Sequence, residues 1–389
     1  MYFEQNMTIE KSEDFDGESP TLKWGMFVKV AIMGAGLSGL ACAITLEKHD
    51  ITPTIFEKRS RVGDRFVNGE AFLPLLNRPI NDCYAYLAER HGIYLQPLSN
   101  IKMLTIYSEN SRASLHGHLG FLNVRGRESD SLESQLARQV KSKIIFNSNY
   151  TYEELLQEYT HVILATGDAA YTEKIQEFKR DLTVTLKGAT VEGQFDKRHV
   201  GVWLDYNIAP QGYGYLLPFS EHEATITLGY PDYPYNQRLD TQALWDKFYQ
   251  RICKDLEQDL RITDRFEVTH YIMGMCQNPR IGNTFFVGNC FGALMPAFGF
   301  GQITAILSGI YAAEDLSGHG HYDELLRLLK QSYKYSLAIR RALEHLDNRK
   351  IDALVRLVQS DLANRLIVSP KINLLKIIGF LMQPFNYNK

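Results

Sequence analysis

The sequence lacks the features that identify disulfide-rich proteins, thiolate metalloproteins and general nucleic-acid binders. Its five cysteines are spread over 389 residues without a C-x-x-C pair, which disfavours a disulfide framework and a thiolate metal site. Its 42 Lys and Arg do not outnumber its 45 Asp and Glu, so a global positive field is missing. We expect a protein of the reducing cytoplasm that has no nucleic-acid partner.

Motifs of several enzyme classes are also missing. The chain has no G-x-S-x-G, H-E-x-x-H or P-loop motif, so hydrolase and kinase functions have no support. Among its 11 histidines are the pairs His116/His118 and His319/His321, and neither pair has a carboxylate at ligand spacing. We predict no metal site and place both pairs in loops.

Residues 281–313 carry no charge, yet we do not expect them to span a membrane. The run is long enough for a transmembrane helix, but Pro296 and clustered glycines interrupt it, and they predict a strand, a glycine-rich loop and a helix. Residues 1–25 carry six acidic side chains against two lysines and lack the basic start and apolar run of a signal peptide. We expect them to form a mobile acidic tail.

The strongest local signal is a glycine-rich turn between a predicted strand at 28–33 and a predicted helix that ends near His49. A second predicted strand, at 53–56, leads to an acidic residue. Glycines at this spacing allow a tight turn, a close approach to a pyrophosphate and close helix packing, and the acid can accept hydrogen bonds from a ribose. The pattern predicts a dinucleotide site with contacts from Gly34, Gly36, Leu37, Ser38, Gly39, Glu57 and Lys58.

Two later segments resemble those of two-dinucleotide-binding flavoproteins. An apolar strand at 161–164 ends in A-T-G, and residues 287–301 resemble the V-G-D-A-A-G-x-x-x-P-x-x-G-x-G motif of FAD oxidoreductases. Asn289 replaces the family's Asp, and its amide oxygen can still accept a hydrogen bond, without the charge. The resemblance implies FAD as the cofactor, with contacts from Thr166, Gly167, Gly288, Asn289, Pro296, Gly299 and Gly301.

Residues 210–218 resemble the P-x-x-Y-x-W-x-F-P pattern of the geranylgeranyl reductase family. They lie in an alternating stretch that predicts a β-hairpin, and the period of two places Tyr213, Tyr215 and Leu217 on one face. That face would line the pocket of an apolar substrate or, alternatively, pack on the core of its own domain. The resemblance also implies an arginine near the cofactor, which would be Arg125 or Arg127. A further cofactor contact is expected from Arg65, in the loop at 58–73. Several reductases carry a Cys in this loop, and this chain has none there.

The motifs together predict an α/β fold in which a Rossmann-like FAD-binding domain is assembled from separated segments. A mixed β-sheet substrate domain is interleaved with it, has a helix near 241–260 and is followed by a C-terminal helical region. The expected segments are 26–74, 120–170 and 281–320 for FAD, 75–119 and 171–280 for the substrate, and 321–389 for the helices.

The C-terminal region has an unusual charge and an apolar helix. From Tyr322 onward, twelve Lys and Arg stand against six Asp and Glu. Apolar residues recur at helical spacing between Ile372 and Met382, next to Lys371 and Lys376. Such a helix either lies on an anionic membrane surface, making the protein peripheral, or docks on the protein core.

The resemblance implies an FAD-dependent oxidoreductase that reduces C=C bonds of a polyprenyl or lipid-like substrate by hydride transfer from reduced flavin. We expect the loop at 291–302 to shape the flavin pocket, and no side chain stands out as the catalytic acid. No second dinucleotide motif is visible, so the electron donor, NAD(P)H or ferredoxin, stays open. There are two alternatives, an aromatic monooxygenase and a non-catalytic FAD-binding protein. Aromatic monooxygenases usually have G-A-D-G at the end of the second strand, where this chain has A-T-G.

Overall fold

The computed structural model describes residues 28–382 and contains two β-sheets. Sheet A has the strand order β13-β14-β7-β1-β2-β6, and β1 lies at its centre, parallel to β7 and β2. This parallel arrangement confirms the predicted Rossmann-like unit. The strands of sheet A are β1 (Val30–Met33), β2 (Thr54–Phe56), β6 (Ile144–Ile145), β7 (His161–Leu164), β13 (Arg280–Ile281) and β14 (Thr284–Phe286).

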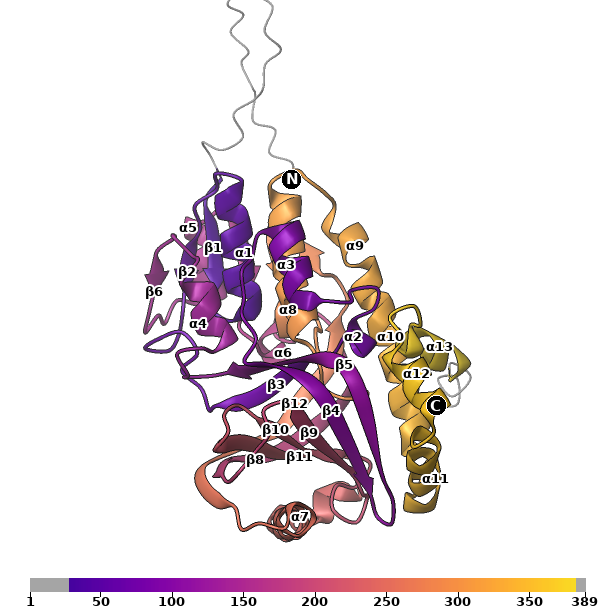
Figure 1. Cartoon of the computed structure of the whole chain (residues 1–389). Helices are drawn as coiled ribbons and strands as arrows, with labels where there is room; N and C mark the ends of the chain where they lie inside the picture. The colour runs from indigo at the N-terminus through magenta and orange to yellow at the C-terminus, as the bar shows by residue number, and fades with distance from the viewer. Residues whose placement is uncertain (1–27, 383–389) are drawn as a thin grey trace, which may run out of the picture.

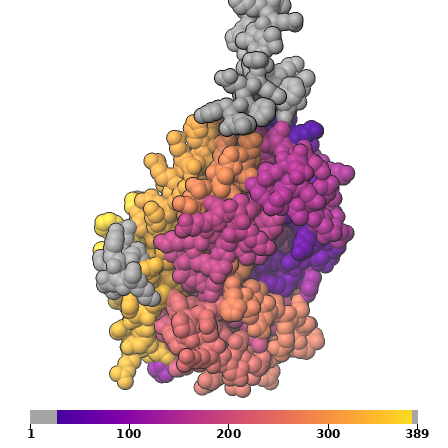
Figure 2. Space-filling model, turned by 180° about the vertical axis from the view of Figure 1, so that it is seen from behind, coloured from indigo at the N-terminus to yellow at the C-terminus, as the bar shows by residue number. Residues whose placement is uncertain are grey.

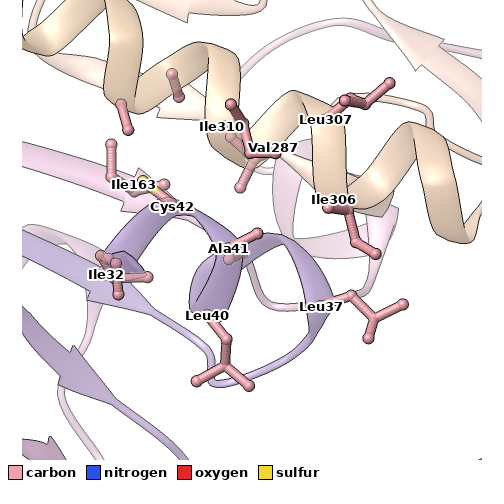
Figure 3. Close-up of a cluster of buried hydrophobic side chains, with 14 of the residues drawn as sticks. Ile32, Leu37, Leu40, Ala41, Cys42, Ile163, Val287, Ile306, Leu307 and Ile310 are labelled. Atoms are coloured by element: carbon pink, nitrogen blue, oxygen red, sulfur yellow. The ribbon is translucent and has the colours of Figure 1, made fainter. Parts of the chain in front are cut away.

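Two helices from opposite ends of the chain pack together on sheet A. They are α1 (Leu37–Lys48) and α8 (Gln302–Leu316), and both are apolar around most of their circumference. Figure 3 shows side chains of both helices, such as Leu40 and Ile306, in one buried cluster with Ile32 and Ile163 of the sheet. Burial of this cluster joins the early and late segments of the chain into one domain.

Sheet B has eight strands in the order β12-β8-β11-β10-β9-β4-β5-β3 and lies below sheet A in Figure 1. Its pairs are antiparallel except for β4 with β9, so the sheet is mixed, as predicted. The strands are β3 (Asn68–Phe72), β4 (Ser99–Ser108), β5 (Arg112–Arg125), β8 (Phe178–Glu192), β9 (His199–Leu204), β10 (Tyr213–Pro218), β11 (Glu223–Pro231) and β12 (Arg261–Cys276).

Helix α7 (Thr241–Leu256) covers one face of sheet B with Trp245 and Phe248, which are buried against Trp203. The prediction of a helix as far as residue 260 was four residues too long, because Glu257 takes a left-handed conformation with φ of +54°. The predicted hairpin is confirmed as β10 and β11. The predicted loop at 58–73 was wrong in part, because 68–72 pair with β5 as a strand.

Short helices connect the strands, and the C-terminal region is helical, as predicted. Figure 2 shows the C-terminal helices as a ridge along one edge of the molecule. Within residues 28–382, no helix is long and apolar enough to cross a membrane. The remaining helices are α2 (Pro74–Asn77), α3 (Cys83–His91), α4 (Leu132–Ala137), α5 (Tyr152–Glu158), α6 (Ala169–Thr172), α9 (Tyr322–Leu325), α10 (Arg327–Glu344), α11 (Asn348–Val358), α12 (Asp361–Val368) and α13 (Leu374–Leu381).

The last of these helices docks by one face only. Leu375 is 6% exposed, and Gly379 lies directly against Tyr335 of α10. The opposite face leaves Ile377, Phe380 and Leu381 at 47%, 63% and 63% exposure. One face of the helix therefore docks on the protein, and contact of the other face with a membrane stays a prediction. The predicted tail at 1–25 lies outside the described residues.

Candidate functional site

Three loops meet at one edge of sheet A. They follow β1, β7 and β14, which are neighbouring parallel strands, so their carboxyl ends lie at the same edge. The loops also touch one another, because the Asn289 amide nitrogen donates a hydrogen bond to the carbonyl oxygen of Gly167 at 3.0 Å. The bond uses the amide nitrogen, so the Asn289 side-chain oxygen can still accept a hydrogen bond from a ligand.

Three of the predicted glycines allow these loops to pack closely. Gly34 has a φ of +118°, and a Cβ there would collide with the carbonyl oxygen of Ala165. A Cβ on Gly39 would collide with the Gly34 carbonyl, and one on Gly288 would lie 2.6 Å from the Ser38 hydroxyl. Glycine is therefore required at these positions by the protein's own contacts.

Gly36 and Gly167 differ from these, because they border open space. A Cβ built on either residue meets no atom of the described chain within 4 Å. Gly36 is also the N-cap of α1, and among residues 28–382 no side chain caps that helix and its first turn holds no acid. Its first amide groups are thus left for an anion, which the helix dipole favours.

Glu57 directly follows β2, the strand that pairs with β1 on the side away from β7. Its carboxylate accepts hydrogen bonds from the backbone N–H groups of Ala35, at 2.8 Å, and Arg59, at 2.9 Å. Each carboxylate oxygen has a second lone pair that can still accept from a hydroxyl. The neighbouring Lys58 side chain is exposed.

A charged cluster joins sheet B to the start of α8. Gln302, the first residue of α8, donates to the Glu70 carboxylate. Arg125 lies 3.7 Å from that carboxylate and 2.7 Å from the carboxylate of Glu133. Burial by itself would lower the pKa of Arg125, but the two carboxylates raise it above its ordinary value, so the guanidinium stays charged.

The two other predicted arginines lie in different environments. The Arg65 guanidinium lies 4.4 Å above the ring of Phe66, and burial together with the charge of Arg125 lowers its pKa. Arg127 is ion-paired with Asp264. The structure therefore places Arg65 and Arg125, and not Arg127, at the cluster.

The predicted tyrosines face the loop between β14 and α8. The Tyr213 hydroxyl donates to the carbonyl oxygen of Phe298, and its ring lies 6.0 Å from the ring of Tyr215. Tyr215 reaches Asn68 at 3.4 Å, and burial raises its pKa to about 12, so it is protonated at neutral pH. Leu217 is instead packed in the core of sheet B with Ile101, Leu122 and Val200.

The same loop contains the remaining predicted residues. Pro296 is buried, Gly299 has a φ of +70°, and Gly301 is the N-cap of α8. A Cβ on Gly301 would lie 2.9 Å from the carbonyl oxygen of Ala293, so glycine allows the loop to fold back on itself. Within the described part of the chain, α8 also has no side-chain cap.

Glu70 and Tyr271 are residues of this site that the sequence did not predict, and Gln302 was predicted only as the end of the loop at 291–302. Glu70 and Gln302 are 232 positions apart, and Tyr271 comes from β12 and contacts Asn289 through its hydroxyl. The sequence places Gln302 directly after the predicted Gly301, which is a usable signal. Nothing in the pattern around Tyr271 distinguishes it from other strand tyrosines.

The residues present fit an FAD molecule. The uncapped start of α1 and the open faces of Gly36 and Gly167 suit a pyrophosphate, and Glu57 suits a ribose. Asn289 and the cluster of Glu70, Arg125 and Gln302 offer polar groups between the two sheets. The fold and the donor set agree with a dinucleotide that extends from sheet A toward sheet B.

Comparisons with known proteins give the class of fold. Residues 32–71 match the NAD(P)-binding Rossmann-like domain, a family described by its dinucleotide-binding unit. No curated protein sequence matches the chain. The match begins within β1, covers α1 and β2, and ends within β3.

Several solved structures share the whole architecture. A geranylgeranyl bacteriochlorophyll reductase-like protein from Thermoplasma acidophilum has a TM-score of 0.68 at 17% identity, over 92% of this chain and 100% of that one. A flavin-dependent brominase has a TM-score of 0.64 at 12% identity, over 94% of this chain and 100% of the brominase chain. A mutant of 2-methyl-3-hydroxypyridine-5-carboxylic acid oxygenase has a TM-score of 0.57 at 15% identity, over 88% and 97%. The chain therefore has the fold of FAD-dependent oxidoreductases.

Proposed function

We propose that the protein is an FAD-dependent oxidoreductase that reduces C=C bonds of an apolar, polyprenyl or lipid-like substrate. The proposal rests on three glycine-dependent loops that meet at the uncapped start of α1 and on two tyrosines of sheet B, Tyr213 and Tyr215, of which Tyr213 contacts the loop before α8. Bound FAD would supply the hydride chemistry.

The chain's own residues would bind and orient the cofactor. The first amides of α1 would hold the pyrophosphate, Glu57 the ribose and Asn289 the ribityl chain. The loop from Phe291 to Gln302 would shape the inner pocket, because the hydrogen bond from Tyr213 holds it against sheet B. These contacts position the cofactor and exclude water.

The proton for the second carbon of a reduced double bond needs a donor, and Glu70 is well placed to supply it. Its carboxyl group lies at the start of α8, within reach of Asn68 at 3.3 Å, which in turn contacts the Tyr215 hydroxyl at 3.4 Å. This row of polar groups runs from the charged cluster to the tyrosine wall. The Tyr215 hydroxyl donates to Asn68 and the Asn68 amide donates to Glu70, so the row orients these groups and carries no proton. Glu70 would take up a proton from solvent and give it to the substrate directly.

The aromatic wall supports an apolar substrate. Tyr213 and Tyr215 are half-buried with their rings side by side, and the Tyr213 ring also lies next to Phe298. Their hydroxyl groups are engaged by protein acceptors, so the ring faces are the surface offered to a ligand. Leu217 would support this wall from the core side.

The C-terminal ridge fits an anionic bilayer surface as the place where such a substrate is collected. On α13, Ile377, Phe380 and Leu381 are exposed beside Lys371 and Lys376, which are exposed as well. Apolar residues that enter the interface, flanked by lysines that contact headgroup phosphates, bind anionic lipid. The protein would then be peripheral on the membrane.

Anaerobic turnover tests the reaction class. The purified protein, with its flavin reduced by dithionite or by NAD(P)H, is mixed with a polyprenyl acceptor in detergent, and flavin absorbance and product mass are followed. The proposal predicts reoxidation by the acceptor and a mass gain of two hydrogens per reduced bond. A reduced flavin that the acceptor leaves unoxidised, but that oxygen reoxidises in a parallel aerobic assay with an aromatic substrate and a hydroxylated or halogenated product, would instead support a monooxygenase or halogenase.

A further inference from the structure

We propose that the protein binds a divalent transition-metal ion, with zinc as the reference case, through His49, Glu314 and His319. This cluster lies at the ends of α1 and α8, away from the loops described above. The ligand atoms of the three side chains all lie within 4.8 Å of one another. The proposal does not depend on the flavin or on the proposed reaction.

Each ligand is positioned by a helix end. His49 is the C-cap of α1, and Glu314 lies in the last turn of α8. His319 follows Gly318, whose φ of +78° ends that helix, and the His319 N–H donates to the Glu314 carbonyl at 2.8 Å. Because α1 and α8 are packed together in the core, the two helix ends are held side by side.

The distances suit a metal ion. The His49 Nε2 atom lies 3.6 Å from a Glu314 carboxylate oxygen. Two ligands that are each about 2.0–2.1 Å from a tetrahedral zinc ion are about 3.3 Å apart. The pair therefore needs a movement of only a few tenths of an ångström to share one ion. Two imidazoles with one carboxylate form a ligand set that zinc accepts, with further positions for water.

The second imidazole needs a larger movement. The rings of His49 and His319 are stacked, with centroids 4.2 Å apart and planes 28° apart. Stacked rings cannot both direct a nitrogen at one ion, so the His319 ring must turn out of the stack. That turn costs little, because His319 is exposed in the segment after α8.

A neighbouring cation shares the carboxylate. Lys48 interacts with Glu314, and its ammonium group also donates to the His91 carbonyl. A bound divalent ion would add positive charge here, and the Glu314 carboxylate is the anion that offsets it. The bound ion would link the C-terminal ends of α1 and α8, whereas their N-terminal ends face the cofactor site. The two ends of α1 are about 18 Å apart.

Calorimetric titration with zinc chloride tests the proposal on the full-length, tag-free protein as purified, after removal of metal with EDTA. We expect one ion per chain, a Tm that rises with zinc concentration, and binding at least tenfold weaker in His49→Ala, His319→Ala and Glu314→Gln. His321→Ala, two residues beyond the site, is the matched control and should bind as the wild type does.

The double variant His49→Ala/His319→Ala is the measurement that can overturn the proposal. If it binds zinc as tightly as the wild type, the ion is held elsewhere and the proposal is wrong, as it is if the wild type binds no zinc. X-ray absorption of the zinc-loaded wild type is independent of variant folding. It should show only nitrogen and oxygen ligands with the signature of two imidazoles, and any other ligand set overturns the assignment.

Discussion

The carboxylate of Glu70 lies where β3 meets the first turn of α8, and it is linked to Gln302, Asn68 and Arg125. Glutamine at this position keeps the shape and the oxygen that accepts from Gln302, but it cannot deliver a proton. The Glu70→Gln variant therefore separates a proton-donor role from a purely structural one.

We predict that Glu70→Gln lowers the rate of acceptor reduction by about 10²- to 10⁴-fold while FAD absorbance and Tm stay close to the wild type. Stopped-flow reoxidation across pH checks this, because one ionisation should disappear from the rate profile. An unchanged rate and profile would remove Glu70 from the reaction.

Gly36 offers a second test at the scale of one residue. A side chain there meets open space in the protein itself, so Gly36→Val should fold with little loss of stability and block the pyrophosphate path. We expect FAD binding at least about 100-fold weaker, or about 2.7 kcal/mol. Flavin titration and thermal unfolding measure the two effects, and a yellow, FAD-loaded variant would contradict the placement of the cofactor.

The difference between Gly36 and Glu70 also shows what the sequence can predict. Gly34, Gly36 and Gly39 act within one turn, so their spacing is visible in the chain, and the structure confirms the strand, turn and helix around them. Glu70 and Gln302 become neighbours only through the packing of β3 against α8. The proposed zinc ligands are likewise not visible as a group in the sequence, since Glu314 and His49 come from separate helices.

Tyr215 and Leu217 lie on the same face of β10 but differ in burial. Leu217 is 9% exposed within the core of sheet B, whereas Tyr215 is half-buried. The alternation of the strand was predicted correctly, but the period of two could not separate a substrate contact from core packing. Substitutions at the two positions should therefore have different effects.

We predict that Leu217→Ala lowers the free energy of unfolding by about 2–5 kcal/mol. Tyr215→Ala should weaken substrate reduction instead, with the flavin spectrum intact and a smaller loss of stability. Urea unfolding and steady-state kinetics on both variants check this. Equal loss of stability with unchanged kinetics in the soluble fraction would assign Tyr215 to the core.

Helix α11 is fixed to β4 and β5 through a buried carboxylate. Asp352 accepts hydrogen bonds from Ser108, at 2.5 Å, and from the backbone and side chain of Asn110, at 3.1 and 3.0 Å. Burial raises the pKa of Asp352, but these donors outweigh it and the net pKa lies below the ordinary 3.8. The stabilisation is therefore present above pH 3.8 and is lost as the pH falls through the lower folded-state pKa.

We predict that Asp352→Ala lowers the free energy of unfolding by about 1–3 kcal/mol at pH 7, and that the difference shrinks below pH 3.8. Denaturant unfolding at several pH values measures it, with the exposed Asp130→Ala as the control. A pH-independent difference would show that packing, and not the carboxylate, fixes α11.

Helix α13 carries the test of membrane contact. The double variant Ile377→Glu/Phe380→Glu changes exposed residues, so it should keep the fold and reduce cosedimentation with anionic liposomes at least tenfold. Tyr94→Glu/Leu156→Glu, which changes exposed apolar residues on other elements, is the matched control. If both variants bind liposomes as the wild type does, α13 is a packing element only.

At the scale of the whole molecule, two sheets and a helical ridge place distant segments around one site (Figure 1). The α/β class, the parallel sheet A and the mixed sheet B follow from local patterns and are confirmed. The exact borders of the predicted domains, the electron donor and the substrate depend on surfaces that form only in the folded state. They stay predictions.

Anaerobic reoxidation of the reduced holoprotein by a polyprenyl acceptor tests most directly whether the protein is an FAD-dependent C=C reductase. NAD(P)H and ferredoxin are compared as electron donors in the same experiment. We expect one FAD per chain, reduction by one of these donors, and return of the oxidised flavin spectrum together with a product in which the C=C bond is saturated. A protein that purifies without FAD and does not take it up, or a reduced flavin that no unsaturated acceptor reoxidises, would contradict it.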